Sequence, residues 1–152
     1  RSSVFRIIRL SVWKGDSNSE LEDQTDGLHS IIPTPWVDEN NIFGVGSYGA
    51  LRGLDTQTGA RLWATYKATG NDRWWNAFLV AHKDRFFIHN EQGDLIIATL
   101  TGEGYEELSR AKLGEATRKV RRRMTIWSHP AFAMQSVFAR NDNELVRVNL
   151  AK

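Results

Sequence analysis

Residues 42–55, Ile-Phe-Gly-Val-Gly-Ser-Tyr-Gly-Ala-Leu-Arg-Gly-Leu-Asp, and residues 86–99, Phe-Phe-Ile-His-Asn-Glu-Gln-Gly-Asp-Leu-Ile-Ile-Ala-Thr, are two copies of one pattern. Phe43 and Gly49 of the first copy have counterparts 44 residues later in the second. Each copy consists of an apolar run, a cluster of glycine and polar residues, and a second apolar run, which is the pattern of an antiparallel hairpin. A third copy begins at Val137, so the chain is built on an internal repeat.

A repeat of this length that offers four short strands is typical of a β-propeller blade. Residues 105–113 are also compatible with a helix, but they occupy the fourth strand position of the second repeat, so we predict a strand there. Strands are expected near residues 31–36, 41–46, 50–55, 61–66, 75–81, 84–89, 94–100, 105–110, 127–132, 135–140 and 144–150. The predicted fold is all-β, a propeller of four-stranded antiparallel blades with about three blades plus the end of a preceding one, in an incomplete ring.

The expected organisation is a single partial propeller over residues 1–152. Trp13 and Trp63 lie 50 residues apart and each closes an apolar strand, which predicts equivalent outer-strand positions. The expected parts are the end of a preceding blade at 1–14, a polar linker loop at 15–30, a blade at 31–74, a blade at 75–126 that carries a basic loop at 114–124, and a final, incomplete blade at 127–152.

The composition excludes several classes of site. The 152 residues contain no cysteine, so disulfides, thiolate zinc sites and cysteine nucleophiles are excluded. The formal net charge of +2 is too small to imply nucleic acid as a partner. No apolar run approaches the roughly 20 residues that a membrane-spanning helix needs.

Two further patterns have ordinary structural explanations. Residues 44–49 read Gly-x-Gly-x-x-Gly, which in a dinucleotide site must follow a strand and open a helix. Residues 51–55 are strand-like instead, so we predict a hairpin turn. The four histidines, His29, His82, His89 and His129, show no metal-binding spacing, and we expect them to be exposed or hydrogen-bonded.

The run Gly53-Leu54-Asp55-Thr56-Gln57-Thr58-Gly59-Ala60-Arg61-Leu62-Trp63 resembles the repeat signature of the pyrroloquinoline-quinone-type propellers, Ala-x-Asp-x-x-Thr-Gly-x-x-x-Trp, with Gly53 in place of alanine. Asp55 and Thr58-Gly59 predict a tight turn between the third and fourth strands. Trp63 is large enough to dock between adjacent blades. Partial copies at 98–102 and 148–150 extend the resemblance over nearly the whole chain.

The resemblance implies a fold but assigns no activity. Members of this family that oxidise alcohols use the quinone, a bound calcium, an acidic base and often a vicinal cysteine pair. This chain has no cysteine, and none of its carboxylates matches the calcium or base positions, so we assign no catalytic, cofactor-binding or metal residue. Pyrroloquinoline quinone with calcium is expected only if a longer parent chain supplies the ligands. Other members are scaffolds, and some resemble a periplasmic lipoprotein that assists outer-membrane assembly, which implies an extracytoplasmic, periplasmic location.

Three residues are candidates for a ligand or channel face. Adjacent strand residues point to opposite faces of a sheet, so at most one of Trp74 and Trp75 can face inward. They either pack in the core and between blades or offer a stacking platform to a sugar or planar ligand. His129 lies near the start of an inner strand, where a central channel can be lined; the alternative is an ordinary hydrogen-bonded histidine.

Five basic residues lie within six positions of the insertion between the second and third repeats: Arg118, Lys119, Arg121, Arg122 and Arg123. They predict either a solvated loop or a contact with an anionic surface such as lipid headgroups, acidic polysaccharide or nucleic acid. No aromatic residue interleaves the cluster, so we do not expect it to stack on nucleic acid bases.

These observations favour a non-catalytic, quinoprotein-like propeller segment that acts as a scaffold for a protein partner or a small ligand. The first alternative is part of a quinone-dependent oxidoreductase whose cofactor and calcium ligands lie in an N-terminal region outside this sequence. The second is a polyanion-binding module that uses the basic loop. Open blade edges would aggregate if left uncovered, so we also expect self-association or further N-terminal blades to cover them.

Overall fold

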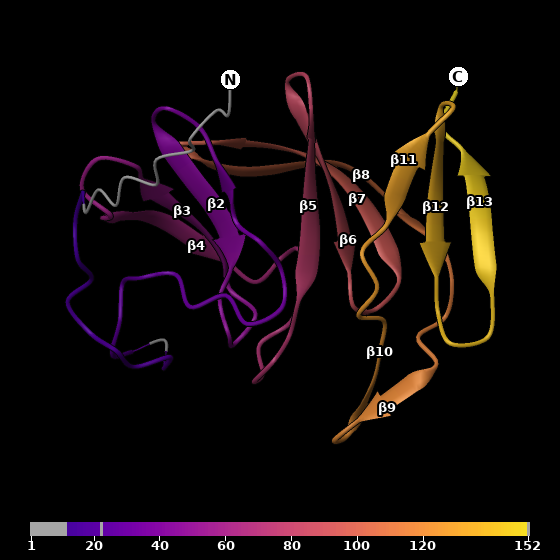
Figure 1. Ribbon diagram of the computed structural model, residues 1–152, viewed down its shortest axis with the longest axis horizontal. Helices are drawn as coiled ribbons and strands as arrows, with labels where there is room; N and C mark the ends of the chain where they lie inside the picture. Colours follow the sequence, from indigo (N-terminus) through magenta and orange to yellow (C-terminus); the bar gives the residue numbers. More distant parts are fainter. Residues whose placement is uncertain (1–11, 22, 152) are drawn as a thin grey trace, which may run out of the picture.

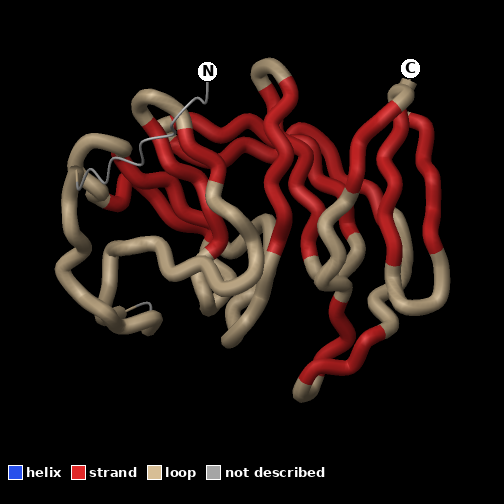
Figure 2. Tube along the Cα trace, in the orientation of Figure 1, coloured by secondary structure: helices blue, strands red, loops and turns tan. Residues whose placement is uncertain are grey.

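The computed structural model describes residues 12–21 and 23–151, and every regular element in these two ranges is a β-strand (Figure 2). Thirteen strands form four small antiparallel sheets, and none of the sheets closes into a barrel. Residues 1–11, most of the predicted end of a preceding blade, lie outside the described ranges. Within these ranges the structure contains no helix long and apolar enough to cross a membrane.

Three of the sheets follow one another along the chain, and a short hairpin connects the last two. The first sheet is β1 Trp36–Val37, β2 Asn41–Val45, β3 Leu51–Asp55 and β4 Arg61–Thr65. The second sheet is β5 Ala77–His82, β6 Arg85–Asn90, β7 Asp94–Thr101 and β8 Gly104–Lys112. The basic hairpin is β9 Arg118–Val120 and β10 Arg123–Thr125, and the third sheet is β11 Ala131–Ala133, β12 Ser136–Arg140 and β13 Leu145–Asn149.

The strand predictions are confirmed for the second sheet and for the later strands of the first and third sheets, and they are wrong in extent for the first strands of the first and third sheets. Residues 105–113, the stretch compatible with a helix, form most of the nine-residue strand β8. The strand predicted at 31–36 is reduced to Trp36–Val37, and the one predicted at 127–132 to Ala131–Ala133. Prolines at 33, 35 and 130 explain this difference, because proline has no N–H to donate and restricts the residue before it.

The three larger sheets stand in series, each with one face toward the next (Figure 1). Between the first and second sheets, the ring of Phe86 packs edge-on against the rings of Phe43 and Trp36. The distances between ring centres are 5.7 Å to Phe43 and 4.9 Å to Trp36. These rings belong to a core cluster with buried aliphatic residues of both sheets. Between the second and third sheets, Phe87 stacks on Phe132 at 4.8 Å. The apolar core is therefore divided into layers between consecutive sheets.

The outer edges of the sheets are linked by a contact that occurs twice. The indole of Trp13 donates a hydrogen bond of 2.9 Å to the carbonyl of Thr56, at the β3–β4 turn. The indole of Trp63, in β4, donates one of 2.7 Å to the carbonyl of Thr101, at the β7–β8 turn. A β-carbon added at Gly59 would collide with the Trp13 ring, so the indole can approach the turn only because residue 59 has no side chain. Trp13 and Trp63 thus make equivalent contacts to successive sheets.

The turn that Trp13 contacts is stabilised by the Asp55 and Thr58 side chains of the repeat signature. The Asp55 carboxylate accepts hydrogen bonds from the N–H of Gln57 at 3.0 Å, the N–H of Thr58 at 2.7 Å and the Thr58 hydroxyl at 2.8 Å. The hydroxyl and N–H of Thr58 lower the pKa of Asp55 because they favour its charged form. Gly59 closes the turn with φ +75. The prediction of a tight turn between the third and fourth strands is confirmed.

The 44-residue repeat is visible in the backbone as well as in the sequence. Gly49 and Gly93, the counterparts in the first two copies, have φ values of +93 and +92. A β-carbon at either would collide with a carbonyl oxygen, that of Gly70 for the first and of Gly114 for the second. The string at 44–49 therefore forms the predicted β2–β3 hairpin.

Candidate functional site

The basic cluster lies in a hairpin that projects beyond the sheets at the bottom of Figure 1. The prediction of a loop at 114–124 is wrong for the central part of that range, because residues 118–120 pair in register with 123–125. Arg121 and Arg122 form the two-residue turn, and Arg121 has a φ of +54 where glycine is usual. Sequence reasoning missed the hairpin because its turn has no glycine, asparagine or aspartate.

The base of this hairpin is anchored by a buried ion pair. Glu91, in the β6–β7 turn, is 1% exposed, and one of its carboxylate oxygens accepts a charge-assisted hydrogen bond from the Arg123 guanidinium. The other oxygen accepts one of 2.9 Å from the indole of Trp127. Burial raises the pKa of Glu91, and the bonds from Arg123 and Trp127 act in the opposite direction. Arg123 is therefore occupied as a structural partner of Glu91, unlike the exposed cations of the cluster.

Trp75 completes the anchor and is a packing residue. The guanidinium of Arg123 lies 5.0 Å above the Trp75 ring, and its terminal nitrogens reach the carboxylate of Asp72 at 3.4 Å and the carbonyl of Arg73 at 3.1 Å. The indole of Trp75 lies so close to Gly70 that a β-carbon there would collide with it. The structure favours packing for this residue over a ligand platform.

Trp74 has a different environment from its neighbour. Its ring is approached by two guanidinium groups, Arg121 at 4.5 Å and Arg73 at 5.4 Å from the ring centre. Trp74 also has a φ of +69, which is costly for a bulky side chain, and its N–H donates to the carbonyl of Ser47 at 2.6 Å. The chain fold thus places aromatic rings beside the basic cluster, although no aromatic residue interleaves the cluster in sequence.

The remaining cations of the cluster are exposed. Arg118 lies 3.6 Å from Asp142, and both side chains are more than half exposed, so this pair adds little stability. Lys119, Arg121 and Arg122 have no acidic partner within 4.0 Å in the part of the chain that the structure describes. The hairpin tip therefore concentrates positive charge.

His129 does not join this group. Its Nδ1 lies 2.6 Å from the carbonyl oxygen of Pro130, and its ring packs 5.0 Å from that of Phe78 in β5. These contacts agree with an ordinary, hydrogen-bonded histidine at the second interface between sheets.

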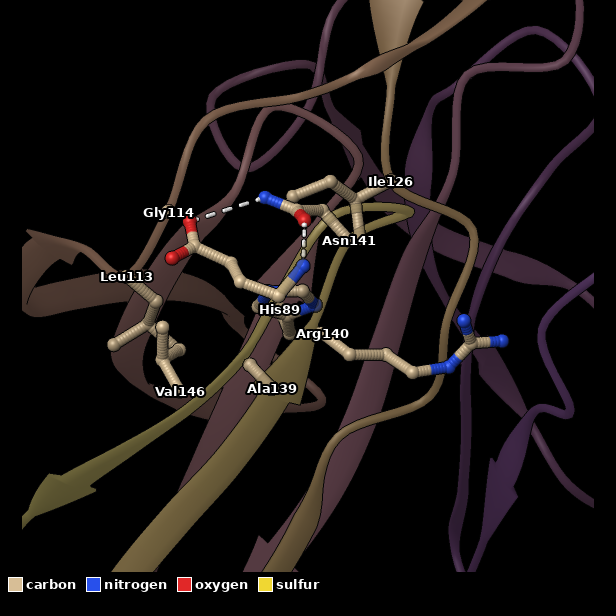
Figure 3. Close-up of a pocket in the computed structure, with 9 residues that line it drawn as sticks. His89, Leu113, Gly114, Ile126, Ala139, Arg140, Asn141 and Val146 are labelled. Atoms are coloured by element: carbon tan, nitrogen blue, oxygen red, sulfur yellow. Dashed lines mark hydrogen bonds between the residues drawn. The ribbon is translucent and has the colours of Figure 1, made fainter.

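His89 is a residue that sequence reasoning left among the exposed or hydrogen-bonded histidines. It is 1% exposed, and neither ring nitrogen has a hydrogen-bond partner among the described residues, which contradicts that prediction. Figure 3 shows its ring at the centre of a group of residues around a cavity of about 10 Å³, enough for one water molecule. The repeat contained a signal, because His89 lies 44 residues after Val45, which is buried. The lining is His89, Leu113, Gly114, Ile126, Ala139, Arg140, Asn141, Glu144 and Val146.

Burial of His89 predicts that the fold weakens in mild acid. Desolvation lowers the pKa of His89 to about 4; the charge of Asp94 opposes this by a smaller amount, and His129 lowers the pKa slightly further. The unfolded chain takes up this proton near pH 6.5 and the folded one only near pH 4, so stability is lost as the pH falls through that window. The complete loss, reached below pH 4, should be roughly 3 kcal/mol, and roughly 2 kcal/mol of it should be present at pH 4.5. Urea unfolding at pH 7 and pH 4.5 measures it.

The control for this prediction is His89→Leu, which restores the apolar character of the repeat position. Its free energy of unfolding should fall much less between the two pH values than that of the parent chain. An equal decrease in both proteins would assign the acid sensitivity to other groups.

The site thus combines two left-handed residues, Trp74 and Arg121, with an anchored basic hairpin. Within the described ranges, no three His, Asp or Glu side chains are grouped to hold a metal ion. Comparisons with protein-family models and with curated proteins find no match for this chain.

Proposed function

We propose that this chain is part of a quinoprotein-like β-propeller, with the first and second sheets as four-stranded blades and the third as an incomplete one. The observation that carries this proposal is an indole contact that occurs twice. Trp13 docks on the β3–β4 turn of the first sheet, and Trp63 docks on the β7–β8 turn of the second sheet. The matching glycines at 49 and 93 support the same repeat. A strand from beyond the described residues, or from a second copy, would complete the sheet that ends at β13.

In this proposal the segment is a non-catalytic scaffold that binds a protein or a small ligand, in an extracytoplasmic compartment. A scaffold role is supported by two carboxylates that are already engaged in hydrogen bonds within the protein. Asp55 is occupied by three hydrogen bonds within its turn, and Glu91 by Arg123 and Trp127. Neither carboxylate is arranged as a base or as a calcium ligand. The basic hairpin projects beyond the sheets and offers an exposed surface to a partner.

Titration with pyrroloquinoline quinone and calcium, followed by gel filtration with absorbance and light-scattering detection, tests the scaffold assignment. We expect no stoichiometric quinone to elute with the protein, because the described residues offer no group of three carboxylates or histidines to hold the calcium ion. A known quinone-dependent dehydrogenase treated in the same way is the positive control. Quinone bound one-to-one and released by a calcium chelator would contradict a non-catalytic role and favour the oxidoreductase.

A further inference from the structure

Exposed apolar side chains lie beside the basic hairpin. Ile31 is 52% exposed, and it borders a small cavity that Trp74 and the buried amide of Asn76 also line. Met124, in β10, is 45% exposed. Ile31 and Trp74 are far apart in sequence, so this neighbourhood is a product of the fold. An aliphatic side chain and an indole therefore share the surface from which the hairpin projects.

The pairing of the hairpin determines which side chains face away from the protein. Lys119 is the direct partner of Met124, so the two side chains lie on the same face of the ribbon. The neighbours of Met124 in β10, Arg123 and Thr125, are directed into the protein, where Arg123 contacts Glu91 and Thr125 is buried. The outward face thus combines one cation with one apolar side chain, and the tip adds Arg121 and Arg122.

Acidic side chains confine the positive charge to this tip. Asp72 lies against Arg123 on one side of the hairpin base, and Asp142 lies near Arg118 on the other. A long polyanion such as nucleic acid or a sulfated polysaccharide needs a continuous track of cations. Binding to a planar anionic surface requires only that a projecting, positively charged tip can reach it.

We propose that this patch, defined as Ile31, Trp74, Lys119, Arg121, Arg122 and Met124, docks the protein on the surface of an anionic lipid bilayer. Cations near such a surface are attracted by its negative potential, at about 1 kcal/mol for each lysine or arginine, or roughly fivefold in partitioning. Tryptophan is favoured at the level of the headgroups, and exposed aliphatic side chains add burial in the interface.

The patch is held ready for this contact by its surroundings. The buried pair of Glu91 and Arg123 fixes the base of the hairpin, and Arg121 rests on the Trp74 ring. Little conformational entropy of the hairpin should therefore be lost when its tip contacts a flat surface.

Sedimentation with lipid vesicles tests the proposal. The parent chain should bind vesicles of equimolar phosphatidylcholine and phosphatidylglycerol, and not phosphatidylcholine alone, with weaker binding at higher salt. The double variant Arg121→Gln/Arg122→Gln should lower partitioning roughly 30-fold, from two lost charges. The matched control is Lys83→Gln/Arg85→Gln, which removes the same charge from the β5–β6 turn at the opposite end in Figure 1 and should bind like the parent.

A second variant separates a bilayer from other anionic partners. Ile31→Ser/Met124→Ser keeps every charge, and it should weaken vesicle binding several-fold while leaving retention on immobilised heparin unchanged. Circular dichroism and the thermal midpoint confirm that each variant is folded. Equal vesicle binding by both patch variants and the parent would overturn the proposal, as would retention on heparin or an acidic peptide without any binding to anionic vesicles.

Discussion

Replacement of Trp63 by alanine is expected to lower the free energy of unfolding by about 4 kcal/mol. The indole lies against Phe43 with ring centres 5.8 Å apart, packs over Gly53 of its own sheet, and donates to the carbonyl of Thr101 in the next sheet. Its removal therefore opens the layer between two sheets and leaves the β7–β8 turn without its partner. Urea unfolding followed by circular dichroism measures the loss.

Two variants show which part of the Trp63 contact matters. Trp63→Phe retains a ring against Phe43 but loses the hydrogen bond to Thr101, and it should cost about 1 kcal/mol beyond the change in packing. Leu108→Ala removes an exposed apolar side chain from β8 and should change stability by no more than about 0.5 kcal/mol. A Trp63→Ala protein as stable as the Leu108→Ala protein would contradict docking by the indole.

Replacement of Arg123 by alanine is expected to cost about 4 kcal/mol at neutral pH, because it leaves the buried carboxylate of Glu91 without its cation. Burial already raises the pKa of Glu91, and removal of Arg123 raises it further. A carboxyl group whose folded pKa lies above its unfolded pKa destabilises the fold increasingly as the pH rises between the two values. The defect should therefore be smaller at pH 5 than at pH 7, as measured by urea unfolding at both.

A compensating change distinguishes an unpaired charge from lost packing. The double variant Arg123→Met/Glu91→Leu removes both charges and keeps apolar volume, and it should recover part of the lost stability, reduced by the cost of the Trp127 indole N–H that loses its acceptor. Arg122→Ala, the neighbouring exposed arginine, should change stability by no more than about 0.5 kcal/mol. A defect in Arg123→Ala that is independent of pH, and that the double variant does not repair, would mean that Glu91 is not the reason for it.

The candidate site was only partly predictable from the sequence. Trp74, Trp75 and the basic residues were each recognised, but as separate candidates, because the two groups lie more than 40 residues apart. Arg123 could not be distinguished from Arg122 by its type or its position, although Arg123 is mostly covered and paired with the buried Glu91, whereas Arg122 is exposed. His89 was missed because histidine is common both at surfaces and in cores, and only its alignment with Val45 indicated burial.

The repeat, most of the strands and the turns within the three larger sheets could be predicted from the sequence, whereas the β9–β10 hairpin could not. The predictable features follow from local chemistry: the alternation of apolar residues, the glycines at 49 and 93 that accept a positive φ, and the Asp55 turn that Thr58 and Gly59 complete. The contacts between side chains of different sheets, in contrast, depend on the packing of the folded chain. Arg121 on Trp74, Arg123 on Glu91 and Ile31 beside Trp74 depend on how consecutive sheets stack, and the burial of a charge depends on that stacking rather than on its neighbours in sequence.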